Sequence, residues 1–522
     1  MVVVPSERNG TEENVSMMAH AWICLITTLA AAGSPNVLVI VADDLGADRI
    51  GCGGESLVRT PNIDRLAAEG TWFQHAYANS PVCTASRQSF LTGRLPQEVG
   101  VTRLTTALGE GTVTLAELMR QAGYRTATFG KMHFNSKLPH GFDVQVDRPD
   151  HERWLKKNPR APLPTGIQVL PPWRPFKDPA SVWLNSQVLP YPSRDAEMTS
   201  TWLVEQAEEY LNRTDDRPFF VMVSLTEPHS PFHFPIEFRG RISPASMHVP
   251  EVTAADEEQI PEIFRALTDQ EKQGIRAAYL TSVEFLDLNV GRLMNALSAS
   301  PHANNTLVVF LGDHGYMLGE HGRFEKHCFF EPAVRAPLIL RIPGQAQAST
   351  SDALVEFIDL APTVLDYCHL PSSSTFTGKS LMPIVRREPG ADARHRDAVF
   401  SLYTENEEAM IRDRKYKFVY STGERRRKDG YDTGRSLPGE SMTLFDMTAD
   451  PGEKRNLAGD PESKAIIERF ERILYDRLVP THFRREEMPM GLSRRDAIRW
   501  CLVPRDGTDP VAGKRKESAL EK

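Results

Sequence analysis

Short hydrophobic runs recur along the first three-quarters of the chain, and polar residues follow them directly. The runs at 37–42 and 306–312 are unbroken and rich in Val, Leu and Ile or Phe. Runs of this kind are typical of strands buried on both faces of a parallel sheet. A third apolar run at 219–225 and a further segment at 124–129 are predicted to be strands of the same sheet.

Between these strands, apolar residues return at helical spacing. In 112–121 the leucines and the methionine fall on one face of a helix, and Gly123 provides a stop. A longer stretch of the same kind covers 269–297. The alternation of strands and helices predicts an α/β domain over residues 35–385.

After a Ser/Thr-rich connector at 371–378, the pattern changes to short runs of β character. These runs lie at 398–403, 409–412, 416–420 and 442–445, and a helix is predicted at 462–478. They predict a small α+β domain over residues 386–485. The remaining residues, 486–522, are polar and mixed in charge, and we expect a poorly ordered tail.

Two segments allow two interpretations each. Proline and tryptophan are concentrated between 148 and 194, which is either an insertion that shapes a pocket rim or a surface loop. The basic run at 425–428 is either a solvated charge run, which we favour, or a contact for a polyanionic substrate.

The composition is that of an ordinary soluble globular protein, with 40% hydrophobic and 25% charged residues in a chain of 522. That length allows more than one domain. The net charge of −8 argues against a general nucleic-acid binder. It still permits a locally positive pocket for an anion, because local charge sets the field of a pocket.

An apolar segment at 17–33 is typical of a signal peptide, with Ala30, Ala31 and Ala32 as the cleavage signal. Residues 1–33 would then be an N-terminal extension that exports the protein to a periplasm, a lumen or the medium. A disordered N-terminus of a cytoplasmic protein is the alternative, because no lysine or arginine lies between Met17 and the apolar run. No segment is predicted to span a membrane.

The chain has six cysteines. Cys24 would leave with the signal peptide, and Cys83 is set aside for chemistry. The other four are widely spaced and define no disulfide framework. Of these, Cys52 and Cys328 are expected to be small residues in buried or half-buried places.

Two of the predicted strands end in aspartate. Asp43 and Asp44 follow the first strand, and Asp313 with His314 follows the strand at 306–312. Ligand groups collect at the carboxyl ends of strands in open α/β sheets, so neighbouring strands would bring three carboxylates together. Two such charges about 4 Å apart repel by roughly 4 kcal/mol at an effective dielectric near 20. The cluster must therefore take up protons or hold a metal ion.

Oxygen-rich ligands point to a hard divalent cation, Ca²⁺ or Mg²⁺. His314 would supply one nitrogen ligand or an outer hydrogen bond. Zinc is disfavoured, because no Cys/His pair has the spacing of a zinc site. For either polar pair taken alone, a helix cap or a turn is the alternative.

Cys83 lies four residues before Arg87, where a loop turns into a helix. Residues 86–91 have helical character, and Gly93 is a stop signal. A nucleophile at a helix start meets free backbone N–H groups and the positive end of the helix dipole, which suits an anionic substrate. A buried thiol beside a surface arginine is the alternative.

Together these motifs resemble the type I sulfatases of the alkaline phosphatase superfamily, over about residues 35–480. Besides Asp43-Asp44 and the signature at 83–94, the matching pieces are Thr60–Arg65, Gly130–His133, Glu227–Pro231, Gly312–Gly315, Gly319–Gly322 with Lys326, Leu444–Met447 and Asp450–Glu453. The Asp-His pair and the Gly-Glu-His-Gly segment are most similar to the iduronate-2-sulfatase and choline-sulfatase branches. The resemblance implies a large, mixed, mainly parallel sheet sandwiched by helices, as in alkaline phosphatase, and a C-terminal domain with a four-stranded antiparallel sheet.

In this family the signature cysteine is oxidised after translation to formylglycine, whose hydrate is the nucleophile. The resemblance implies the same conversion of Cys83. An independent reason supports it, because a thiolate is a soft ligand and a cluster of aspartates selects a hard ion. The commonest family signature has proline where this chain has Ala85, so the maturation enzyme that would convert Cys83 stays open.

The resemblance also implies a role for each site residue. The cation would be held by Asp43, Asp44, residue 83, Asp313 and His314. Arg87 would orient and activate the hydrate, and Lys131 and Lys326 would clamp the sulfuryl oxygens. His133 would be the base that releases sulfate, and His229 the general acid toward the leaving group. Each of the last four, taken alone, would be interpreted as an ordinary polar residue.

Three hypotheses follow. The leading one is a Ca²⁺-dependent sulfatase, with Mg²⁺ as the alternative cation, that acts on a sulfate ester of a small molecule or a sugar. The second is a phosphatase or phosphonate monoester hydrolase of the same superfamily. The third is a non-catalytic protein that binds sulfated glycans and keeps Cys83 as a thiol. His321 is left open as an outer partner of the site or an unrelated polar residue.

Overall fold

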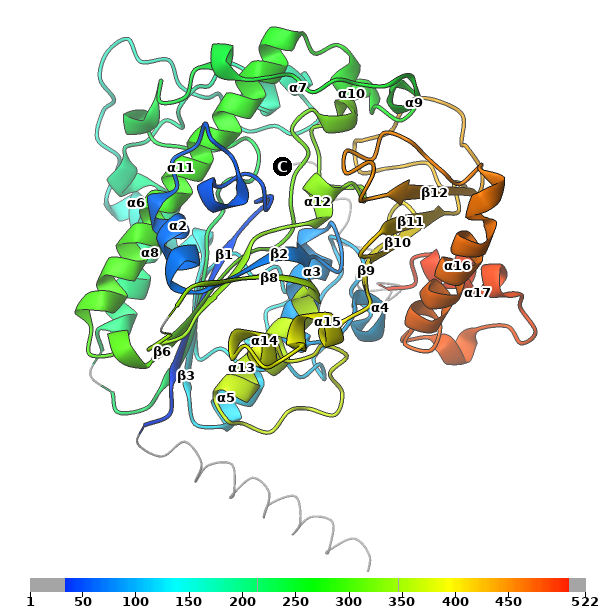
Figure 1. Cartoon of the computed structure of the whole chain (residues 1–522). Coiled ribbons are helices and arrows are strands. Elements are labelled where there is room, and N and C mark those ends of the chain that lie inside the picture. The colour runs from blue at the N-terminus through cyan, green and yellow to red at the C-terminus, as the bar shows by residue number, and fades with distance from the viewer. Residues whose placement is uncertain (1–32, 214, 346, 507–522) are drawn as a thin grey trace, which may run out of the picture.

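The computed structural model describes residues 33–506 except 214 and 346, and this part of the chain forms two sheets (Figure 1). The larger sheet has eight strands in the order β4-β3-β5-β1-β6-β7-β2-β8. Its strands are β1 (Asn36–Ala42), β2 (Thr71–Tyr77), β3 (Arg125–Gly130), β4 (Val144–Val146), β5 (Phe219–Ser224), β6 (Thr306–Gly312), β7 (Leu338–Arg341) and β8 (Ser349–Glu356). The four strands predicted from the sequence are β1, β3, β5 and β6.

The central strands β3, β5, β1 and β6 are neighbours and run parallel. Strand β7 runs antiparallel to β6 and β2, whereas β2 and β8 are parallel. This mixed, mainly parallel sheet confirms the predicted fold class. The register pairs Ala42 with Gly312 and Val41 with Ser224. The carboxyl ends of the central strands therefore lie side by side.

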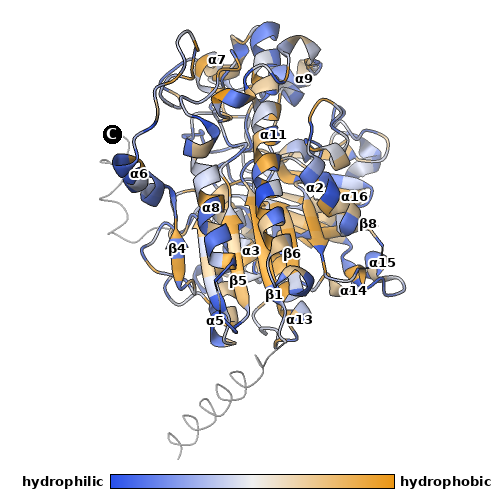
Figure 2. Ribbon diagram, turned by 90° about the vertical axis from the view of Figure 1, so that its left-hand side faces the viewer, coloured by the Kyte–Doolittle hydropathy of each residue, from blue (hydrophilic) through white to orange (hydrophobic). Residues whose placement is uncertain are grey.

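Helices cover both faces of the large sheet. Alternate residues of β1 point to opposite faces, so Leu38 and Ile40 pack with α8 and α11, while Val37 and Val39 pack with α3, α5 and α13. Both faces of this strand are buried, which explains its unbroken apolar sequence. The apolar strands are visible behind α8 and α11 in Figure 2. The helices are α3 (Cys83–Thr92), α5 (Leu115–Gln121), α8 (Thr199–Leu211), α11 (Asp269–Ala299) and α13 (Leu360–Tyr367).

The second sheet belongs to the C-terminal part of the chain and lies beside the first (Figure 1). It is antiparallel, with the order β12-β11-β10-β9, and α16 (Lys464–Leu478) packs against it. Its strands are β9 (Ala398–Tyr403), β10 (Glu408–Asp413), β11 (Tyr416–Ser421) and β12 (Ser441–Asp446). The expected four-stranded antiparallel sheet with one packed helix is therefore confirmed.

The expectation of a poorly ordered tail from residue 486 is wrong for the part of it that the structure describes. Residues 494–502 form a helix, α17 (Arg494–Leu502), that packs on α16. Ile498 and Cys501 are buried there, since the apolar residues of this polar segment fall on one helical face. Beyond it, the carboxylate of Asp506 accepts hydrogen bonds from the backbone N–H and the hydroxyl of Thr102, both at 2.9 Å.

The predicted signal peptide at 17–33 falls almost wholly outside the described residues. In the part of the chain that is described, we find no helix with the length and apolar character to cross a membrane. The five cysteines in that part are all free, Cys328 being buried and Cys52 half-buried as expected.

Candidate active site

The residues that follow four adjacent strands meet at the carboxyl edge of the large sheet. In spatial order they are Lys131 after β3, His229 in the loop after β5, Asp43 and Asp44 after β1, and Asp313 and His314 after β6. Asp44 and His133 both have positive φ, at 67° and 56°, which is uncommon for residues other than glycine. Such conformations cluster at functional sites, where the surrounding structure enforces them.

Gly130 sets the exit of the chain from β3. Its φ is +103°, and a Cβ atom at this position would lie 2.0 Å from the carbonyl oxygen of Ser224 on β5. The position therefore requires glycine. The next residue, Lys131, donates its backbone N–H to the same carbonyl at 3.2 Å. Its ammonium group forms an ion pair with Asp43.

Cys83 is the first residue of α3, and Arg87 lies one turn later on the same helix. Only 1% of the Arg87 side chain is exposed, so the alternative of a surface arginine is wrong. Arg87 Nε donates to Asp313 Oδ2 at 2.8 Å, and its Nη1 donates to Ser224 Oγ at 2.6 Å. The helix ends at Gly93, which has φ 63°, as its sequence predicts. Arg87 thus ties α3 to the ends of β6 and β5.

Four potential metal ligands converge in front of α3. One ligand atom each from Asp43, Asp44, Cys83 and His314 lies within 4.8 Å of all the others, and all four residues are buried. Asp313 adjoins them, because its Oδ1 accepts the backbone N–H groups of Asp44 and His314, both at 3.0 Å. The fold therefore brings together all five residues that were expected to hold a cation.

The donor set suits a hard divalent cation. Asp44 Oδ2 is buried and has no hydrogen-bond partner within the described part of the chain. His314 Nδ1 lies 3.0 Å from the carbonyl oxygen of Gly315, so Nδ1 carries the proton and the lone pair of Nε2 faces the cluster. An orphaned carboxylate oxygen, two further aspartates and one imidazole nitrogen match the ligands that Ca²⁺ and Mg²⁺ accept.

The thiol of Cys83 lies at the centre of this cluster. Its Sγ is 3.1 Å from His314 Nε2, 3.1 Å from Lys326 Nζ and 3.4 Å from Asp43 Oδ1. Burial raises the pKa of the thiol far above its ordinary range, although the two lysines oppose this shift. Burial thus favours the neutral thiol of an unmodified Cys83, and a neutral thiol is a poor ligand for a hard cation.

Two lysines balance the aspartates. Lys326 reaches the cluster from the loop between β6 and β7, and its Nζ donates to Asp44 Oδ1 at 2.6 Å. Burial opposes the charge of Lys326, but Asp44 and its neighbours raise the pKa of the ammonium well above its ordinary value. Burial also opposes the charge of Asp43, which by itself would raise the pKa of this carboxyl. Lys131 and the other cations nevertheless bring the pKa of Asp43 well below its ordinary value. The surrounding charges thus favour the ionised forms of Asp43 and Lys326.

Two histidines flank the cluster with defined tautomers. His133 Nδ1 lies 3.3 Å from the hydroxyl of Thr84, which itself donates to the carbonyl of Leu104 at 2.7 Å. The hydroxyl has one proton, so it accepts from His133 Nδ1, and His133 Nε2 is left as a base. Burial, with Lys131 and Arg87, lowers the pKa of His133 to about 2.

His229 has its Nδ1 2.8 Å from the carbonyl oxygen of Ser230, so Nδ1 carries a proton, and its Nε2 lies 4.0 Å from Asp44 Oδ2. Burial, with Lys326 and Lys131, lowers the pKa of His229 to about 3. A bound sulfate group would offset both lysines and ease protonation of Nε2. His229 therefore faces the cluster through the atom that would transfer a proton.

His321 lies outside this cluster. Its Nδ1 is 2.7 Å from Asp256 Oδ1, and its ring stacks on Phe330 with a centroid distance of 3.6 Å. Neither contact involves a residue of the carboxylate cluster. The interpretation as an unrelated polar residue is therefore the better one.

Arg427 was missed by the sequence analysis, which favoured a solvated charge run at 425–428. Its side chain is buried, and its Nη2 bonds to Glu325 Oε2 at 2.9 Å and to Asp429 Oδ2 at 2.7 Å. Glu325 precedes Lys326 in the chain, so the C-terminal part of the chain contacts the segment that carries a lysine of the candidate site. In the sequence, the acidic residue Asp429 two positions later could have indicated that Arg427 forms an ion pair.

The segment at 148–194 contributes a second missed residue, Trp173. Its ring centroid lies 6.3 Å from that of His229 in an edge-to-face arrangement, and 45% of the side chain is exposed. The contact favours the interpretation of this segment as part of a pocket rim over that of a plain surface loop.

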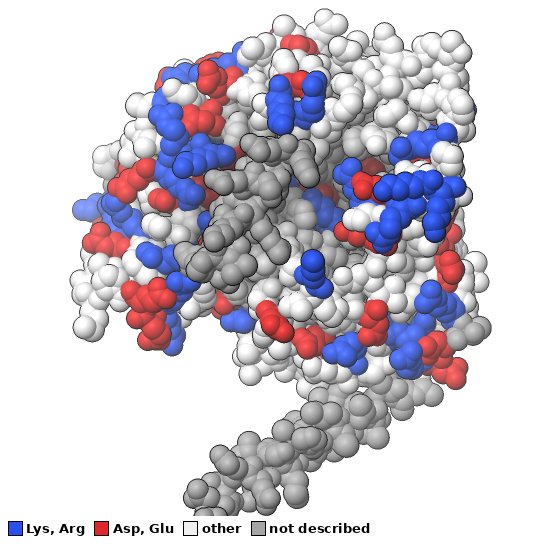
Figure 3. All heavy atoms as spheres, turned by 180° about the vertical axis from the view of Figure 1, so that it is seen from behind, with Lys and Arg blue, Asp and Glu red and all other residues white. Residues whose placement is uncertain are grey.

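On one face of the molecule, lysine and arginine side chains lie on both sides of a hollowed region, with aspartate and glutamate side chains among them (Figure 3). This clustering occurs although the net charge of the chain is −8. A negative net charge is thus compatible with local attraction of anions.

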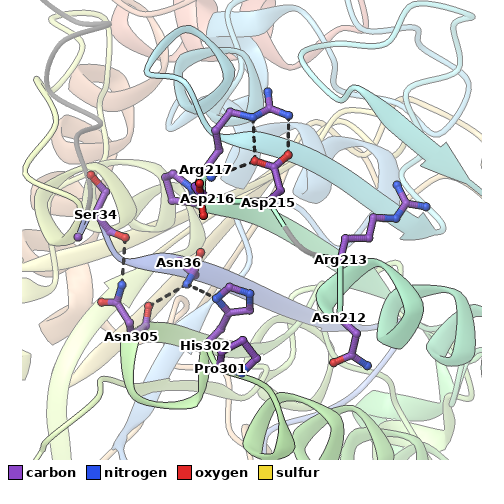
Figure 4. A pocket seen from close by; sticks show the side chains of 12 residues that line it. Ser34, Asn36, Asn212, Arg213, Asp215, Asp216, Arg217, Pro301, His302 and Asn305 are labelled. Carbon is purple, nitrogen blue, oxygen red and sulfur yellow. Dashed lines mark hydrogen bonds and ion pairs between the residues drawn. The ribbon is translucent and has the colours of Figure 1, made fainter.

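A separate cavity of about 680 Å³ lies at the opposite, amino end of the central strands (Figure 4). Its lining residues bond mainly to one another: Asn36 Nδ2 donates to the carbonyl of Asn305 at 3.3 Å, and Arg217 pairs with Asp215 at 2.8 Å. None of the residues of the carboxylate cluster lines it. The cavity is therefore distinct from the candidate active site.

Comparison with protein families agrees with the site. A family model described as sulfatase matches residues 35–370, and one described as the C-terminal part of N-sulphoglucosamine sulphohydrolase matches residues 319–478. Choline-sulfatase of Rhizobium meliloti is 28% identical over 505 residues, covering 90% of this chain and 91% of that protein. Iduronate 2-sulfatase of Homo sapiens is 31% identical over 368 residues, covering 62% of this chain and 63% of that protein.

Solved structures share the fold. The phosphonate monoester hydrolase of Agrobacterium radiobacter matches with a TM-score of 0.71 at 24% identity, covering 86% of this chain and 96% of that chain. At this level of identity the likeness concerns the architecture of both domains and not the substrate.

Proposed function

This chain belongs to the sulfatase family, hydrolases that act on sulfate esters, and we propose that it cleaves a sulfate monoester with residue 83 as the nucleophile. The observation that carries the proposal is the position of Cys83. Its side chain lies at a buried helix start and contacts a lysine, a histidine and an aspartate of one cluster.

Residue 83 would act as formylglycine, formed by a maturation enzyme that exchanges the sulfur and two hydrogens of the side chain for one oxygen. The hydrated aldehyde supplies a hydroxyl oxygen that attacks the sulfur of the ester. The poor match between a neutral thiol and the aspartate cluster supports this conversion. Ala85 replaces the common proline, so the identity of the maturation enzyme is a separate question.

The cationic side chains would bind and orient the sulfate group. Lys326 Nζ lies 3.1 Å from Cys83 Sγ, and Lys131 pairs with Asp43, whose Oδ1 lies 3.4 Å from the same sulfur. Both ammonium groups are therefore available near the reacting atom. Arg87 is fixed by Asp313, and its Nη2 lies 3.6 Å from Asp43 Oδ1 without a hydrogen bond there, so this atom is left to orient the nucleophile. Preorganised charge of this kind is often the largest catalytic contribution.

The two histidines would move protons. His229 Nε2 would donate a proton to the oxygen of the leaving alcohol as the S–O bond of the ester breaks. His133 Nε2, the free base of its tautomer, would remove a proton from residue 83 so that sulfate leaves and the aldehyde returns. The tautomers fixed by Ser230 and Thr84 support this division of roles.

A divalent cation, Ca²⁺ or Mg²⁺, would be held by Asp43, Asp44, residue 83, Asp313 and His314. When bound, it would offset the carboxylates and attract the oxygens of the sulfate group. Asp44 Oδ2, which is buried and accepts no hydrogen bond from the described residues, supports its presence.

The substrate class follows from the relatives only in outline. The named relatives act on choline sulfate and on iduronate 2-sulfate. We propose a small sulfate ester, with a sulfated sugar as the first choice. Export through residues 17–33 belongs to the same proposal, because a signal peptide would direct the enzyme to such substrates outside the cytoplasm.

Mass spectrometry of the tryptic peptide 66–87 is the decisive test of the nucleophile. The chain would be produced with and without a formylglycine-generating enzyme, and the peptide 327–335, which contains Cys328, serves as the unmodified control. We expect the mass of peptide 66–87 to show the exchange of sulfur and two hydrogens for one oxygen, together with sulfatase activity. A thiol in every active preparation would contradict the proposal.

A second candidate function is phosphonate or phosphate ester hydrolysis, favoured by the fold shared with a phosphonate monoester hydrolase. Parallel kinetics on an aryl sulfate and the matched aryl phosphonate separate the two functions. We expect a higher kcat/KM for the sulfate. A clear preference for phosphorus would make the second candidate the better one, and binding without turnover of either ester would favour a non-catalytic protein.

A further inference from the structure

We propose that Trp173 is a specificity-determining residue, a platform on which the sugar ring of the leaving group stacks while its sulfate group occupies the cluster around Cys83. This inference rests on the proposed sulfatase function and names the part of the substrate that lies beyond the reacting sulfur. It assigns a role to a residue that none of the motifs at the site includes.

Trp173 lies beside the proposed acid, His229. Its ring lies edge-to-face with His229 at a centroid distance of 6.3 Å, and His229 Nε2 is itself 4.0 Å from Asp44 Oδ2. The proposed acid must reach the oxygen of the leaving alcohol, so the carbon skeleton of that alcohol starts beside His229. A side chain in contact with His229 is therefore in reach of the first ring of the substrate.

Trp173 is also unusually exposed for a tryptophan. Tryptophan is usually highly buried, and the other tryptophans in the described part of the chain are buried or half-buried. Trp173 leaves 45% of a large apolar surface in water next to a polar site. An indole presents a flat apolar face and one N–H donor, which suits the C–H face and the hydroxyl groups of a pyranose.

The loop around Trp173 is braced, so the platform is held in place. Arg174 and Asp178 close it through two hydrogen bonds of 3.0 and 2.9 Å. Phe176, with φ 59°, packs its ring against Trp183 and Tyr431, both at 5.2 Å. The loop is thus anchored to the helical layer and to the C-terminal domain, while its tryptophan stays uncovered. A rigid aromatic side chain loses little conformational entropy on binding.

A quaternary ammonium group, as in choline, is the competing occupant of an aromatic face. Such a group is usually held by a cage of several aromatic rings, whereas in the described part of the chain the ring of Trp173 packs with that of His229 alone. A sugar ring needs only one flat apolar face on which to stack. The observations therefore favour the sugar.

The test compares kcat/KM of the mature wild type, W173A and W173F on a panel of monosulfated pyranosides, on choline sulfate and on ethyl sulfate. The control is W500F, which alters a tryptophan on α17 that packs against Arg505. We expect W173A to lower kcat/KM by about tenfold or more on the best pyranoside, mainly through KM, equivalent to at least about 1.4 kcal/mol. The kcat/KM of W173A on ethyl sulfate should change by less than about twofold. W173F should keep most of the activity on the pyranoside, and W500F should match the wild type.

Calorimetry gives a readout free of turnover. We expect C83A/W173A to bind the best pyranoside sulfate about tenfold more weakly than C83A does, which matches the loss of kcat/KM expected for W173A. Equal losses on ethyl sulfate and pyranosides would overturn the inference, because Trp173 would then only support His229. Losses confined to choline sulfate would also overturn it, in favour of an ammonium site. Failure of the wild type to hydrolyse any sulfate ester, while it cleaves phosphonates, would refute the proposed function instead.

Discussion

The Nζ atom of Lys326 lies 3.1 Å from Sγ of Cys83. The same ammonium group donates to Asp44 Oδ1 at 2.6 Å, so one lysine joins the candidate nucleophile to a candidate metal ligand. This contact links a helix start at residue 83 to a loop more than two hundred residues later in the chain. The lysine charge, the candidate nucleophile and the candidate metal ligand are therefore parts of one buried cluster.

Replacing Lys326 should remove a charge that acts mainly on the developing negative charge of the sulfate group. We expect K326M to lower kcat by roughly 100-fold or more, the size found when one such donor is removed. The methionine keeps the length of the stem and limits changes in packing. Steady-state kinetics provide the measurement, and K415A, which alters an exposed lysine on the C-terminal domain, is the control. Activity of K326M near that of the wild type would refute the role of Lys326.

Removal of the divalent cation should abolish activity and leave the fold intact. In the structure, Lys131 and Lys326 pair with Asp43 and Asp44, so the carboxylates keep partners when no cation is bound. We expect dialysis against a chelator to abolish turnover, with an unchanged far-ultraviolet circular dichroism spectrum and a lower unfolding temperature, because a ligand that binds only the folded state stabilises it. Added Ca²⁺ or Mg²⁺ should restore activity. Full activity after chelation would contradict the metal site.

Arg427 should be required for stability as well as for the position of Lys326. R427A leaves Glu325 buried without its closest cation, and breaking a buried ion pair from one side costs about 3–5 kcal/mol. We expect a loss of free energy of unfolding in this range, measured by denaturant titration. The double variant E325Q/R427Q should recover part of it, because position 325 then carries no buried charge, while Asp429 still loses its arginine partner.

R426A is the matched control for Arg427, since Arg426 is exposed and pairs with Asp432 at 3.4 Å. Its free energy of unfolding should change by less than about 0.5 kcal/mol. Equal effects of R426A and R427A would show that the buried pair has no special weight.

The helix α17 should stabilise the C-terminal domain. Ile498 is fully buried against α16, so I498A should lower the free energy of unfolding by about 2–5 kcal/mol. L492A alters an exposed leucine just before the helix and should have little effect. Thermal or denaturant unfolding gives the measurement. A neutral I498A would mean that α17 contributes nothing to the stability of the domain.

The parts of the site that could be predicted from the sequence follow strands. Asp43 and Asp313 come directly after apolar runs, and the parallel register then brings them to one edge of the sheet. The roles of Lys326 and His133 came from the family resemblance, because loops carry no periodicity that fixes where they return. The pairing of Arg427 with Glu325 spans 102 positions and two domains, so no local pattern indicates it.

Two further features were missed for physical reasons. In α17 the apolar face is narrow and lies among arginines and aspartate, so the polar average of the segment hides its helical periodicity. Trp173 lies in a segment with no regular secondary structure, where the sequence gives composition but no direction for the side chain.

Thr84 should control the proton on His133. Its hydroxyl accepts from His133 Nδ1 and donates to the carbonyl of Leu104, which keeps Nε2 as the base. T84V has a similar shape and removes both hydrogen bonds, so the proton can move to Nε2 and the release of sulfate should slow. We expect kcat to fall about tenfold to 100-fold, and the alcohol to appear in a burst before a slow steady state.

T84S keeps the hydroxyl and should restore most of the turnover without a burst. The burst separates a positioning role from a general loss of folded enzyme, because loss of folded protein would reduce both phases equally. Stopped-flow detection of the alcohol from an aryl sulfate gives both phases in one trace. If T84V lowers the steady-state rate without a burst of alcohol, Thr84 contributes to packing alone and the tautomer assigned to His133 has no part in catalysis.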